Sequence, residues 1–443
     1  MLDRGGVTGA RVRALETLLP GRATRNFLLI LCAMHVILFV DRVNLAAAAE
    51  TIKHDLGLSN TQLGVAFSAF NYAYAPFQLV GGWIADRYGS RRTLAVCALA
   101  WAVTTMATGA VGGLATLFAV RFCLGMGEGA TLPAATRALT KWTSEAARGF
   151  GMGLTHAAGR IGAGVTAPIV AFLITLMSWR MIFVLLGIVS ALWSLVWLWY
   201  FRDEPSDHKD VSPTELAALA SGVPTARTSG PVPWRRLVPR MVPSMVTYFC
   251  MGWTGWLYVT WMPSLFSKNY GVDMKKSAMF YAATFLCAMV AEFFGGVISD
   301  YLLRRTGRKS IARSMLVTIC LILALCALIP AILVHELMPG VISFTLALLF
   351  LDTAITPMWV AATDIAPEYA GSASALMNAA GAVAGILSPV AFGWILDMTG
   401  SWTMPFVVSI GLMLLGSVTA FWIRPDAALG SGEPRSRLAF APN

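Results

Sequence analysis

Twelve long apolar segments limit what this chain can fold into. A helix that crosses a bilayer needs about 20 mostly apolar residues, and lipid offers no partner to an unpaired backbone amide, so each segment has to be helical. Of the 443 residues, 57% are hydrophobic and 13% are charged, whereas soluble proteins average about 25% charged residues. We therefore predict an all-α membrane protein with twelve transmembrane helices. The segments lie at residues 27–50, 61–85, 93–111, 114–138, 150–177, 180–201, 243–267, 278–302, 311–333, 340–363, 372–397 and 402–424.

The basic residues predict the orientation of these helices. The net charge is +10, which in a soluble chain would suggest nucleic-acid binding. Here Arg and Lys gather in loops on one side, as the positive-inside rule requires, so we expect a multi-pass protein with both termini in the cytoplasm and no nucleic-acid partner. The apolar run at the start is too long and too late for a cleavable signal. All seven cysteines fall inside predicted spans without ligand spacing, so we expect no disulfide, no metal site and no cofactor.

Internal repeats divide the chain into two halves. GGWIADRYGSRR at Gly81–Arg92 returns as GGVISDYLLRRTGRK at Gly295–Lys309, and HAAGRIGAG at His156–Gly164 returns as NAAGAVAG at Asn378–Gly385. Two six-helix repeats predict two pseudo-symmetric bundles with a ligand site near the bilayer midplane, where the halves meet. The expected regions are a cytoplasmic tail 1–26, a bundle 27–201, a linker 202–240 that holds a short helix near Thr214–Ala220, a second bundle 241–425 and a tail 426–443.

Four motifs carry a resemblance to a known family. The loop at Gly82–Arg92 resembles the loop motif of the major facilitator superfamily, which alone identifies only the superfamily. DRVN at Asp41–Asn44, SAFNYAYAPFQLVGGW at Ser68–Trp83 and RFCLGMGEGATLP at Arg121–Pro133 narrow it. Together they are similar to the anion:cation symporter family, in particular to bacterial proton-coupled importers of sugar acids such as galactonate. The resemblance covers about residues 27–425 and implies the major facilitator fold, alternating access and a monomer in a bacterial inner membrane.

Five charged residues lie in the middle third of the predicted first bundle: Asp41, Arg42, Arg121, Glu128 and Arg160. A charge inside the membrane costs about 3 kcal/mol on insertion scales, so charges that persist there are functional by default. The resemblance implies that Asp41 and Glu128 carry protons and that Arg121 pairs with them. Two structural alternatives stay open: the charged residues only fix helix packing, or Glu128 pairs with Arg121 alone.

Arg42 is the candidate for the carboxylate of the substrate, because a guanidinium fork matches a carboxylate with two hydrogen bonds. Asn71 and Tyr74 are polar at the same depth, and the resemblance implies that Tyr74 contacts substrate. Arg160 departs from the family, which tends to carry a neutral amide there. The extra positive charge favours a compact mono- or dicarboxylate, unless Arg160 merely offsets Glu128.

Three further residues complete the expected substrate site. His156 shares a helix side with Arg160, and Asn378 is its counterpart in the repeat. Trp256 shares a face with Trp253 and is suited to stacking on an aromatic acid, although Trp also anchors helices at the membrane interface.

The two loop repeats predict a conformational latch at the cytoplasmic ends of the helices. The first copy comprises Gly82, Asp86, Arg87, Gly89 and Arg91, and the second comprises Asp300, Arg304 and Arg308. An Asp at such a turn can cap a helix N-terminus of the opposite half, which would stabilise the outward-open state. The alternative is a topology anchor without a gating role.

The function expected from these observations is import of a small organic anion together with protons. An exchanger of organic anions and a non-transporting anion sensor of the same fold are the alternatives. Antiport linked to phosphate is disfavoured because residues 243–267 contain no Arg or Lys, and drug export is disfavoured because GRIGAGVTAP separates Gly164 from Pro168. No constellation of residues supports an enzyme.

Overall fold

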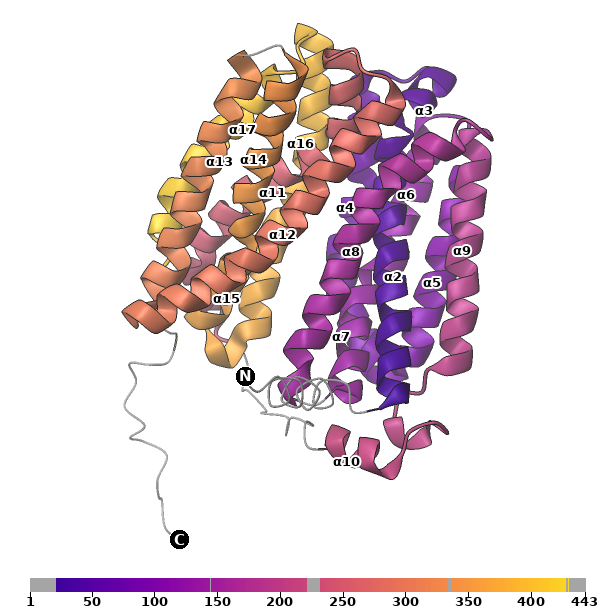
Figure 1. The fold of residues 1–443 in the computed structure, drawn as a ribbon, viewed down its shortest axis with the longest axis vertical. Helices are drawn as coiled ribbons and strands as arrows, with labels where there is room; N and C mark the ends of the chain where they lie inside the picture. Colours follow the sequence, from indigo (N-terminus) through magenta and orange to yellow (C-terminus); the bar gives the residue numbers. More distant parts are fainter. Residues whose placement is uncertain (1–20, 144, 221–231, 334–335, 428, 430–443) are drawn as a thin grey trace, which may run out of the picture. The chain divides into compact units, whose positions relative to one another are not determined.

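The computed structural model describes residues 21–143, 145–220, 232–333, 336–427 and 429. Within these ranges the regular structure is helical, with no strand. Most of the two expected tails and the middle of the expected linker lie outside the described residues. Figure 1 shows the arrangement of the helices.

The first part of the chain forms nine α-helices and one short 3-10 helix in the described ranges. Their bounds are α2 Arg22–Ala47, α3 Ala49–Leu56, α4 Asn60–Tyr88, α5 Ser90–Thr108, α6 Leu114–Gly129, α7 Thr131–Trp142, α8 Glu145–Leu173, α9 Trp179–Tyr200, η1 Pro205–Asp207 and α10 Pro213–Ala220.

The remaining described residues form seven further α-helices, a π-helical turn and a 3-10 turn. Their bounds are α11 Trp234–Asn269, α12 Met274–Thr306, the π-helical turn η2 Ile311–Met315, α13 Leu316–Leu333, α14 Leu337–Thr353, α15 Ile355–Ile365, η3 Pro367–Tyr369, α16 Ala370–Thr399 and α17 Met404–Phe421.

Eight spans in the described part are long and apolar enough to cross a membrane. The other four expected spans coincide with α4, with α5, with α6 and α7 together, and with α11. Three expected continuous helices are interrupted: the first at Ala48, the fourth at Ala130 and the tenth at Ala354. The all-α membrane architecture is confirmed, and the count of twelve spans stays a prediction.

The described residues group into two compact units. The first unit takes the described residues of Met1–Arg227 together with Trp256–Met289 and Gly385–Pro405. The second takes those of Thr228–Gly255, Val290–Ala384 and Phe406–Asn443.

Small residues allow close helix packing in the first unit. A Cβ on Gly162 of α8 would lie 2.5 Å from the backbone oxygen of Val36 on α2, and a Cβ on Gly125 of α6 would lie 2.2 Å from that of Phe70 on α4. Glycine is therefore needed at both contacts, as is common where membrane helices approach closely. These contacts hold α2 against α8 and α4 against α6 (Figure 1).

The expected linker contributes to the first unit through α10. Glu215 of α10 is 2% exposed and accepts hydrogen bonds from the backbone amide of Thr24 (2.8 Å) and from its hydroxyl (2.7 Å). Because the first amides of a helix have no partner inside the helix, this carboxylate caps α2 at its beginning. The linker helix thereby fixes the start of the helix that carries Asp41 and Arg42.

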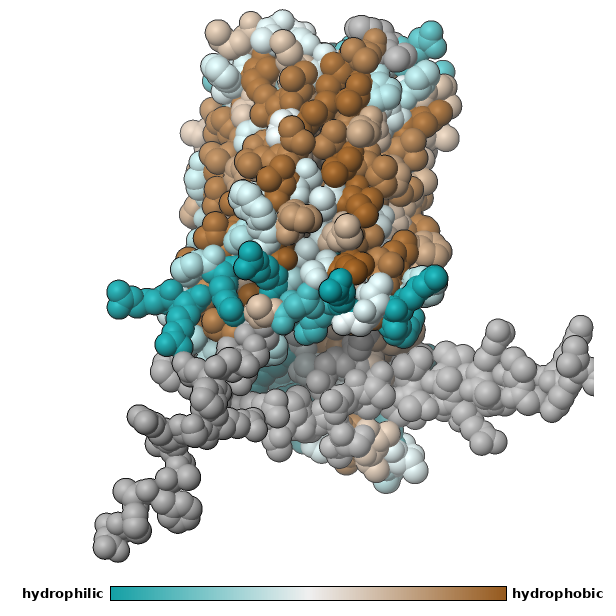
Figure 2. All heavy atoms as spheres, turned by 90° about the vertical axis from the view of Figure 1, so that its left-hand side faces the viewer, coloured by the Kyte–Doolittle hydropathy of each residue, from teal (hydrophilic) through white to brown (hydrophobic). Residues whose placement is uncertain are grey.

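The second unit presents an apolar face bordered by charge. Figure 2 shows a broad hydrophobic surface above a row of hydrophilic side chains. The exposed apolar residues of this unit include Phe293, Phe294, Leu333, Leu414 and Phe421. Arg304, Arg305 and Arg308 at the end of α12 are exposed. This pattern is that of a lipid-facing surface that ends at a basic border.

The N-terminus of α4 is held by a carboxylate from α16 in the same unit. Asp397 accepts hydrogen bonds from the backbone amides of Asn60 (3.2 Å) and Thr61 (2.7 Å), and from their side chains at 2.7 and 2.6 Å. The approach is tight, because a Cβ on Gly393 would lie 2.2 Å from the backbone oxygen of Asn60. We call this contact the outer clasp.

Replacing Asp397 with Ala should weaken the outer clasp. The variant loses a side-chain cap on α4, and such caps contribute about 1 kcal/mol, so the apparent melting temperature of the purified protein in detergent should fall by a few degrees. Thr399→Ala is the matched control, because that hydroxyl donates to the backbone oxygen of Ile395 and accepts from the backbone amide of Ser401, and neither bond reaches α4. Equal melting temperatures for the two variants would contradict a stabilising clasp.

Candidate functional site

Helix α2 directs its two central charges to different sides. Asp41 and Arg42 are consecutive, and consecutive residues of an α-helix diverge by about 100° around the axis. Arg42 contacts Glu128 of α6 and the aromatic rings of α4, whereas Asp41 contacts Ser190 of α9. The charged pair therefore takes part in two separate networks.

Arg42 and Glu128 form an ion pair. The Nε of Arg42 donates to the Oε2 of Glu128 at 2.7 Å, and the two side chains are 13% and 0% exposed. The guanidinium carbon of Arg42 lies 4.6 Å from the ring centre of Tyr74 and 5.1 and 5.4 Å from those of Phe39 and Phe70. Cation–π attraction and exclusion of water both strengthen such a pair.

Each partner of this ion pair keeps an unused polar atom. The Nη2 of Arg42 and the Oε1 of Glu128 are buried and have no hydrogen-bond partner. Buried polar groups are normally satisfied, so such exceptions call for an explanation. A donor of a guanidinium that stays free is suited to binding an anion.

Asp41 lies in a cage of neutral hydrogen-bond donors. It is 1% exposed, its Oδ2 accepts from the hydroxyl of Ser190 at 2.9 Å, and its Oδ1 accepts from the Nδ2 of Asn44 at 3.3 Å. Neither Asn44 nor Ser190 was identified as a site residue from the sequence. Asn44 had a signal, since it follows Asp41 by three residues on the same helix within DRVN, whereas Ser190 is one polar residue in an apolar segment.

Arg121 supports this cage from α6. Its Nη1 donates to the backbone oxygen of Asp41 at 3.2 Å and its Nη2 donates to the Oδ1 of Asn44 at 3.2 Å. The expected partner of the carboxylates thus reaches Asp41 through its backbone and through Asn44. The ion pair of Glu128 is made with Arg42 instead.

Asn71 and Trp256 converge on the same glycine. The Nδ2 of Asn71 donates to the backbone oxygen of Gly385 at 3.1 Å. A Cβ on Gly385 would lie 2.5 Å from the Nε1 of Trp256 and 2.7 Å from the Nδ2 of Asn71. The Oδ1 of Asn71 is buried without a partner, so this amide keeps an acceptor for a further ligand.

Helix α8 places Arg160 and His156 close to α2. Gly159 lies against the ring of Phe39, since a Cβ on it would be 2.6 Å from a ring carbon. Arg42 sits over the same ring. The imidazole of His156 lies 6.3 Å from that of His35 on α2, between ring centres. His156 therefore lies beside α2, and Arg160 follows it by about one turn on the same helix.

Tyr281 of α12 is a further candidate in the first unit. Its side chain is fully buried, its hydroxyl has no hydrogen-bond partner, and it lies close enough to Arg160 for the charge of the guanidinium to act on the hydroxyl. No sequence motif pointed to it. Asn378, the expected counterpart of His156, belongs to the second unit on α16.

The first loop repeat makes its contacts with other residues of the first unit. Gly89 has a φ of 83°, a left-handed conformation that favours glycine, and turns the chain from α4 into α5. The backbone amide of Arg91 donates to Asp203 at 3.0 Å, and the guanidinium of Arg91 donates to the backbone oxygen of Leu198. Asp203 thus caps the start of α5.

Three other residues of this repeat are less informative. Arg87 is exposed and lies over the rings of Trp83 and Tyr88, at 5.6 and 5.8 Å from their centres. Gly82 and Asp86 lie within α4, but their surroundings are outside the described part of the structure. The latch of the first half stays a prediction.

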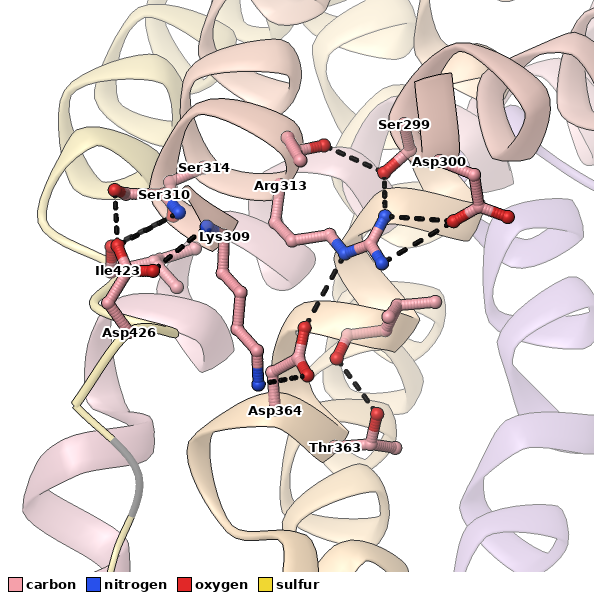
Figure 3. A network of polar contacts seen from close by, with 12 residues as sticks. Ser299, Asp300, Lys309, Ser310, Arg313, Ser314, Thr363, Asp364, Ile423 and Asp426 are labelled. Carbon is pink, nitrogen blue, oxygen red and sulfur yellow. Dashed lines mark hydrogen bonds and ion pairs between the residues drawn. The ribbon is translucent and has the colours of Figure 1, made fainter. Parts of the chain in front are cut away.

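The second loop repeat uses a different arginine from the one expected. Arg313, in the π-helical turn η2, lies between Asp300, with nitrogens at 3.4 and 3.5 Å, and Asp364, at 3.5 Å (Figure 3). Arg304 and Arg308, the expected partners of Asp300, are exposed. The chain turns at Gly307, which has a φ of 66°, and this turn brings Arg313 back beside Asp300.

Two further contacts extend this network. Lys309 binds Asp364 at 2.8 Å, and Asp426 accepts from the backbone amides of Lys309 and Ser310 at 2.8 and 3.0 Å (Figure 3). The hydroxyl of Ser310, helped by these amides and by the charge of Lys309, holds the pKa of Asp426 below its usual value. Asp426 thereby caps the start of η2.

Comparison with known proteins relates this chain to a family of membrane proteins. A family model described as the Major Facilitator Superfamily matches residues 31–389. The chain is 38% identical over 416 residues to a probable sulfoacetate transporter of Cupriavidus necator, covering 93% of this chain and 97% of that protein. It is 27% identical over 390 residues to a D-galactonate transporter of Escherichia coli, covering 85% and 90%.

Solved structures agree on the fold. A bacterial homologue of the human lysosomal transporter Spinster superimposes with a TM-score of 0.76 at 17% identity, covering 91% of this chain and 97% of that chain. A D-xylose–proton symporter gives a TM-score of 0.69 at 14% identity, covering 90% and 98%. At these identities the likeness concerns the fold alone.

Breaking the Arg42–Glu128 pair from one side should be costly. Glu128→Leu leaves a buried unpaired cation, and losing one partner of a buried pair costs about 3–5 kcal/mol in free energy of unfolding. The double variant Arg42→Met/Glu128→Leu should recover most of that loss, because it buries no charge. Detergent unfolding of the two single variants and the double variant tests this. Additive losses would show that the two side chains do not depend on each other.

Proposed function

Since the chain belongs to the major facilitator superfamily, and is therefore a multi-pass membrane transporter and not an enzyme, we propose that it imports a compact organic anion with two charged ends, together with protons. The proposed setting is the bacterial inner membrane with both termini in the cytoplasm. Alternating access by the two bundles is the proposed mechanism, as in transporters built from two repeats.

The observation that carries the proposal is the free Nη2 of Arg42. This nitrogen is buried beside the Tyr74 ring with no partner, while the Nε of the same guanidinium is held by Glu128. A carboxylate or sulfonate that enters would bind Nη2 and compete with Glu128 for the same cation. Protonation of Glu128 would end that competition, so proton binding and anion binding would favour each other.

The charge count favours a dianion. Asp41, Arg42, Arg121, Glu128 and Arg160 together carry one net positive charge when both carboxyls are ionised, and three when both are protonated. Transfer of a dianion into a buried site needs such compensation, because isolated charges are expensive to bury. Arg42 and Arg160 would each hold one end of the substrate.

The comparisons support this class of substrate. The relative at 38% identity is named a probable sulfoacetate transporter, and sulfoacetate carries a sulfonate and a carboxylate on a single methylene carbon. The sugar-acid relatives are named for larger, hydroxylated substrates and are about 27% identical. We therefore propose a short sulfonate-carboxylate or dicarboxylate as the substrate of this chain.

Uptake into proteoliposomes with an acidic exterior tests the function. We expect accumulation of sulfoacetate or a short dicarboxylate above its equilibrium level, and collapse of that accumulation when a protonophore removes the gradient. Accumulation that needs an internal anion and ignores the proton gradient would indicate an exchanger. Binding without any transport would indicate a sensor.

Glu128→Gln should separate the two halves of the cycle. The amide keeps the size of the side chain but cannot exchange a proton, so gradient-driven accumulation should fall at least tenfold while counterflow of labelled substrate persists. Glu204→Gln is the control, because Glu204 pairs with Lys141 and is half exposed. Undiminished accumulation by Glu128→Gln would exclude Glu128 as a proton carrier.

Arg160→Gln should change which anions bind. Loss of one charge-assisted hydrogen bond costs about 1.5–3 kcal/mol, or roughly 10- to 100-fold in affinity, and only an anion with two charged ends would use it. Sulfoacetate binding should weaken by that factor while propionate binding changes little. Arg180→Gln, which removes a charge that binds Asp55 outside the site, is the control. Equal losses for both anions would contradict a role in recognising the second end.

A further inference from the structure

The orientation of the Asn44 amide is fixed by Arg121. A guanidinium can only donate hydrogen bonds, so the atom of Asn44 that faces the Nη2 of Arg121 at 3.2 Å has to be the amide oxygen. The NH₂ group of Asn44 is then left to face the Oδ1 of Asp41 at 3.3 Å. By fixing the orientation of the Asn44 amide, Arg121 ensures that Oδ1 of Asp41 faces a hydrogen-bond donor, the NH₂ group of Asn44.

This arrangement selects the oxygen of Asp41 that can carry a proton. A proton on Oδ1 would point at the NH₂ group of Asn44, which cannot accept it. The other oxygen, Oδ2, faces the hydroxyl of Ser190 at 2.9 Å. A hydroxyl can donate or accept, so Oδ2 has a partner in both protonation states of Asp41. The hydroxyl of Thr105 on α5 also acts on Asp41.

The hydroxyl of Ser190 has a second acceptor within reach. Its oxygen lies 3.1 Å from the backbone oxygen of Leu186, one turn earlier on α9. The single hydroxyl hydrogen can serve Asp41 or Leu186, but not both. Ser190 is fully buried, so exchange between these two bonds would take place in the protein interior.

We propose that Ser190 is a positioning residue for proton coupling, a hydroxyl switch that fixes the exchangeable proton on Oδ2 of Asp41; this rests on the proposed proton-coupled function. When Asp41 is ionised, Ser190 donates to Oδ2. When Asp41 takes up a proton, Oδ2–H donates to Ser190, and the hydroxyl of Ser190 turns to the backbone oxygen of Leu186. In each state both Oδ2 of Asp41 and the hydroxyl of Ser190 then keep a hydrogen-bond partner.

The proposed switch moves only hydrogen atoms between Asp41, Ser190 and Leu186. The charged groups around Asp41 keep their places. Glu128 and Arg121 of α6 act on Asp41 electrostatically. Arg42 and His35 are on α2 itself, and His156 and Arg160 are on the neighbouring α8. The only charged residue of α9 is Arg180 at its outer end, and those of α5 are Arg91 and Arg92 at its cytoplasmic end.

The test compares Ser190→Ala with a serine one turn away. Ser194 is equally buried on α9, but its hydroxyl donates only to the backbone oxygen of Ala95 at 3.1 Å, so Ser194→Ala is a matched control. Removal of the Ser190 hydroxyl takes a charge-assisted hydrogen bond from the ionised form of Asp41. It takes only an ordinary hydrogen bond from the protonated form. Since charge-assisted bonds are about twice as strong, the alkaline fall of uptake should move to higher pH by roughly half to one unit. Ser190→Thr, which keeps the hydroxyl, should restore the original profile.

A second readout does not depend on transport. Infrared difference spectra between acidic and alkaline protein should contain a carboxylic-acid C=O band that Asp41→Asn removes. Ser190→Ala should shift this band, and Ser194→Ala should leave it in place. If Ser190→Ala does not give a monodisperse protein, Ser190→Cys replaces it, because a thiol is a weaker donor and should produce a smaller shift of the same sign.

The outcomes distinguish the two proposals. Absence of proton-driven uptake by the unaltered protein would overturn the proposed function, while the infrared band still decides the role of Ser190. Proton-driven uptake with identical pH profiles and bands for the alanine variants at 190 and 194 would overturn the switch and leave the function standing.

Discussion

The ion pair between Arg42 and Glu128 is the interaction on which the candidate site depends. Two charges are held in an apolar interior, where a lone ion would be several kcal/mol less stable than in water. The 2.7 Å contact and the rings of Tyr74, Phe39 and Phe70 around the guanidinium supply the compensation. The compensation is incomplete, since one nitrogen and one oxygen of the pair stay unpartnered. That remainder is what an anion or a proton can use.

Helix packing makes this pair geometrically possible. Gly125 and Gly129 let α6 approach α4 until added Cβ atoms would lie 2.2 Å from the backbone oxygen of Phe70 and 2.5 Å from the side chain of Phe77. Gly162 lets α8 approach α2 in the same way. Glycine in the middle of a helix is normally unfavourable, and here it lets α6, which carries Glu128, pack closely on α4, and α2, which carries Arg42, pack closely on α8. The same sequence feature therefore serves packing and electrostatics.

Sequence reasoning identified the class of protein and the charged residues, but not their partners. Hydrophobic length and the DRVN motif are properties of the chain itself, so the membrane helices and the position of Asp41 and Arg42 inside one of them were predictable. Which side each residue faces depends on helix rotation, and one position changes it by about 100°. Depth alone therefore could not tell that Glu128 would bind Arg42. Likewise, Asp300 meets Arg313 because of a turn and a π-helical segment, neither of which has a hydrophobic pattern.

The two carboxylates of the site have different neighbours, and this difference gives them different work in the proposed cycle. Glu128 pairs with a guanidinium that has a second nitrogen without a partner. An anion that binds this nitrogen of Arg42 would therefore act directly on Glu128. Asp41 is surrounded by the neutral donors of Ser190 and Asn44, so a bound anion would act on Asp41 only through its long-range electrostatic field. A protein with both carboxylates on one arginine would take up both protons as the anion binds. Because the two environments are separate, protonation of Glu128 can depend on bound substrate. Protonation of Asp41 can depend on which side of the membrane has access to the site.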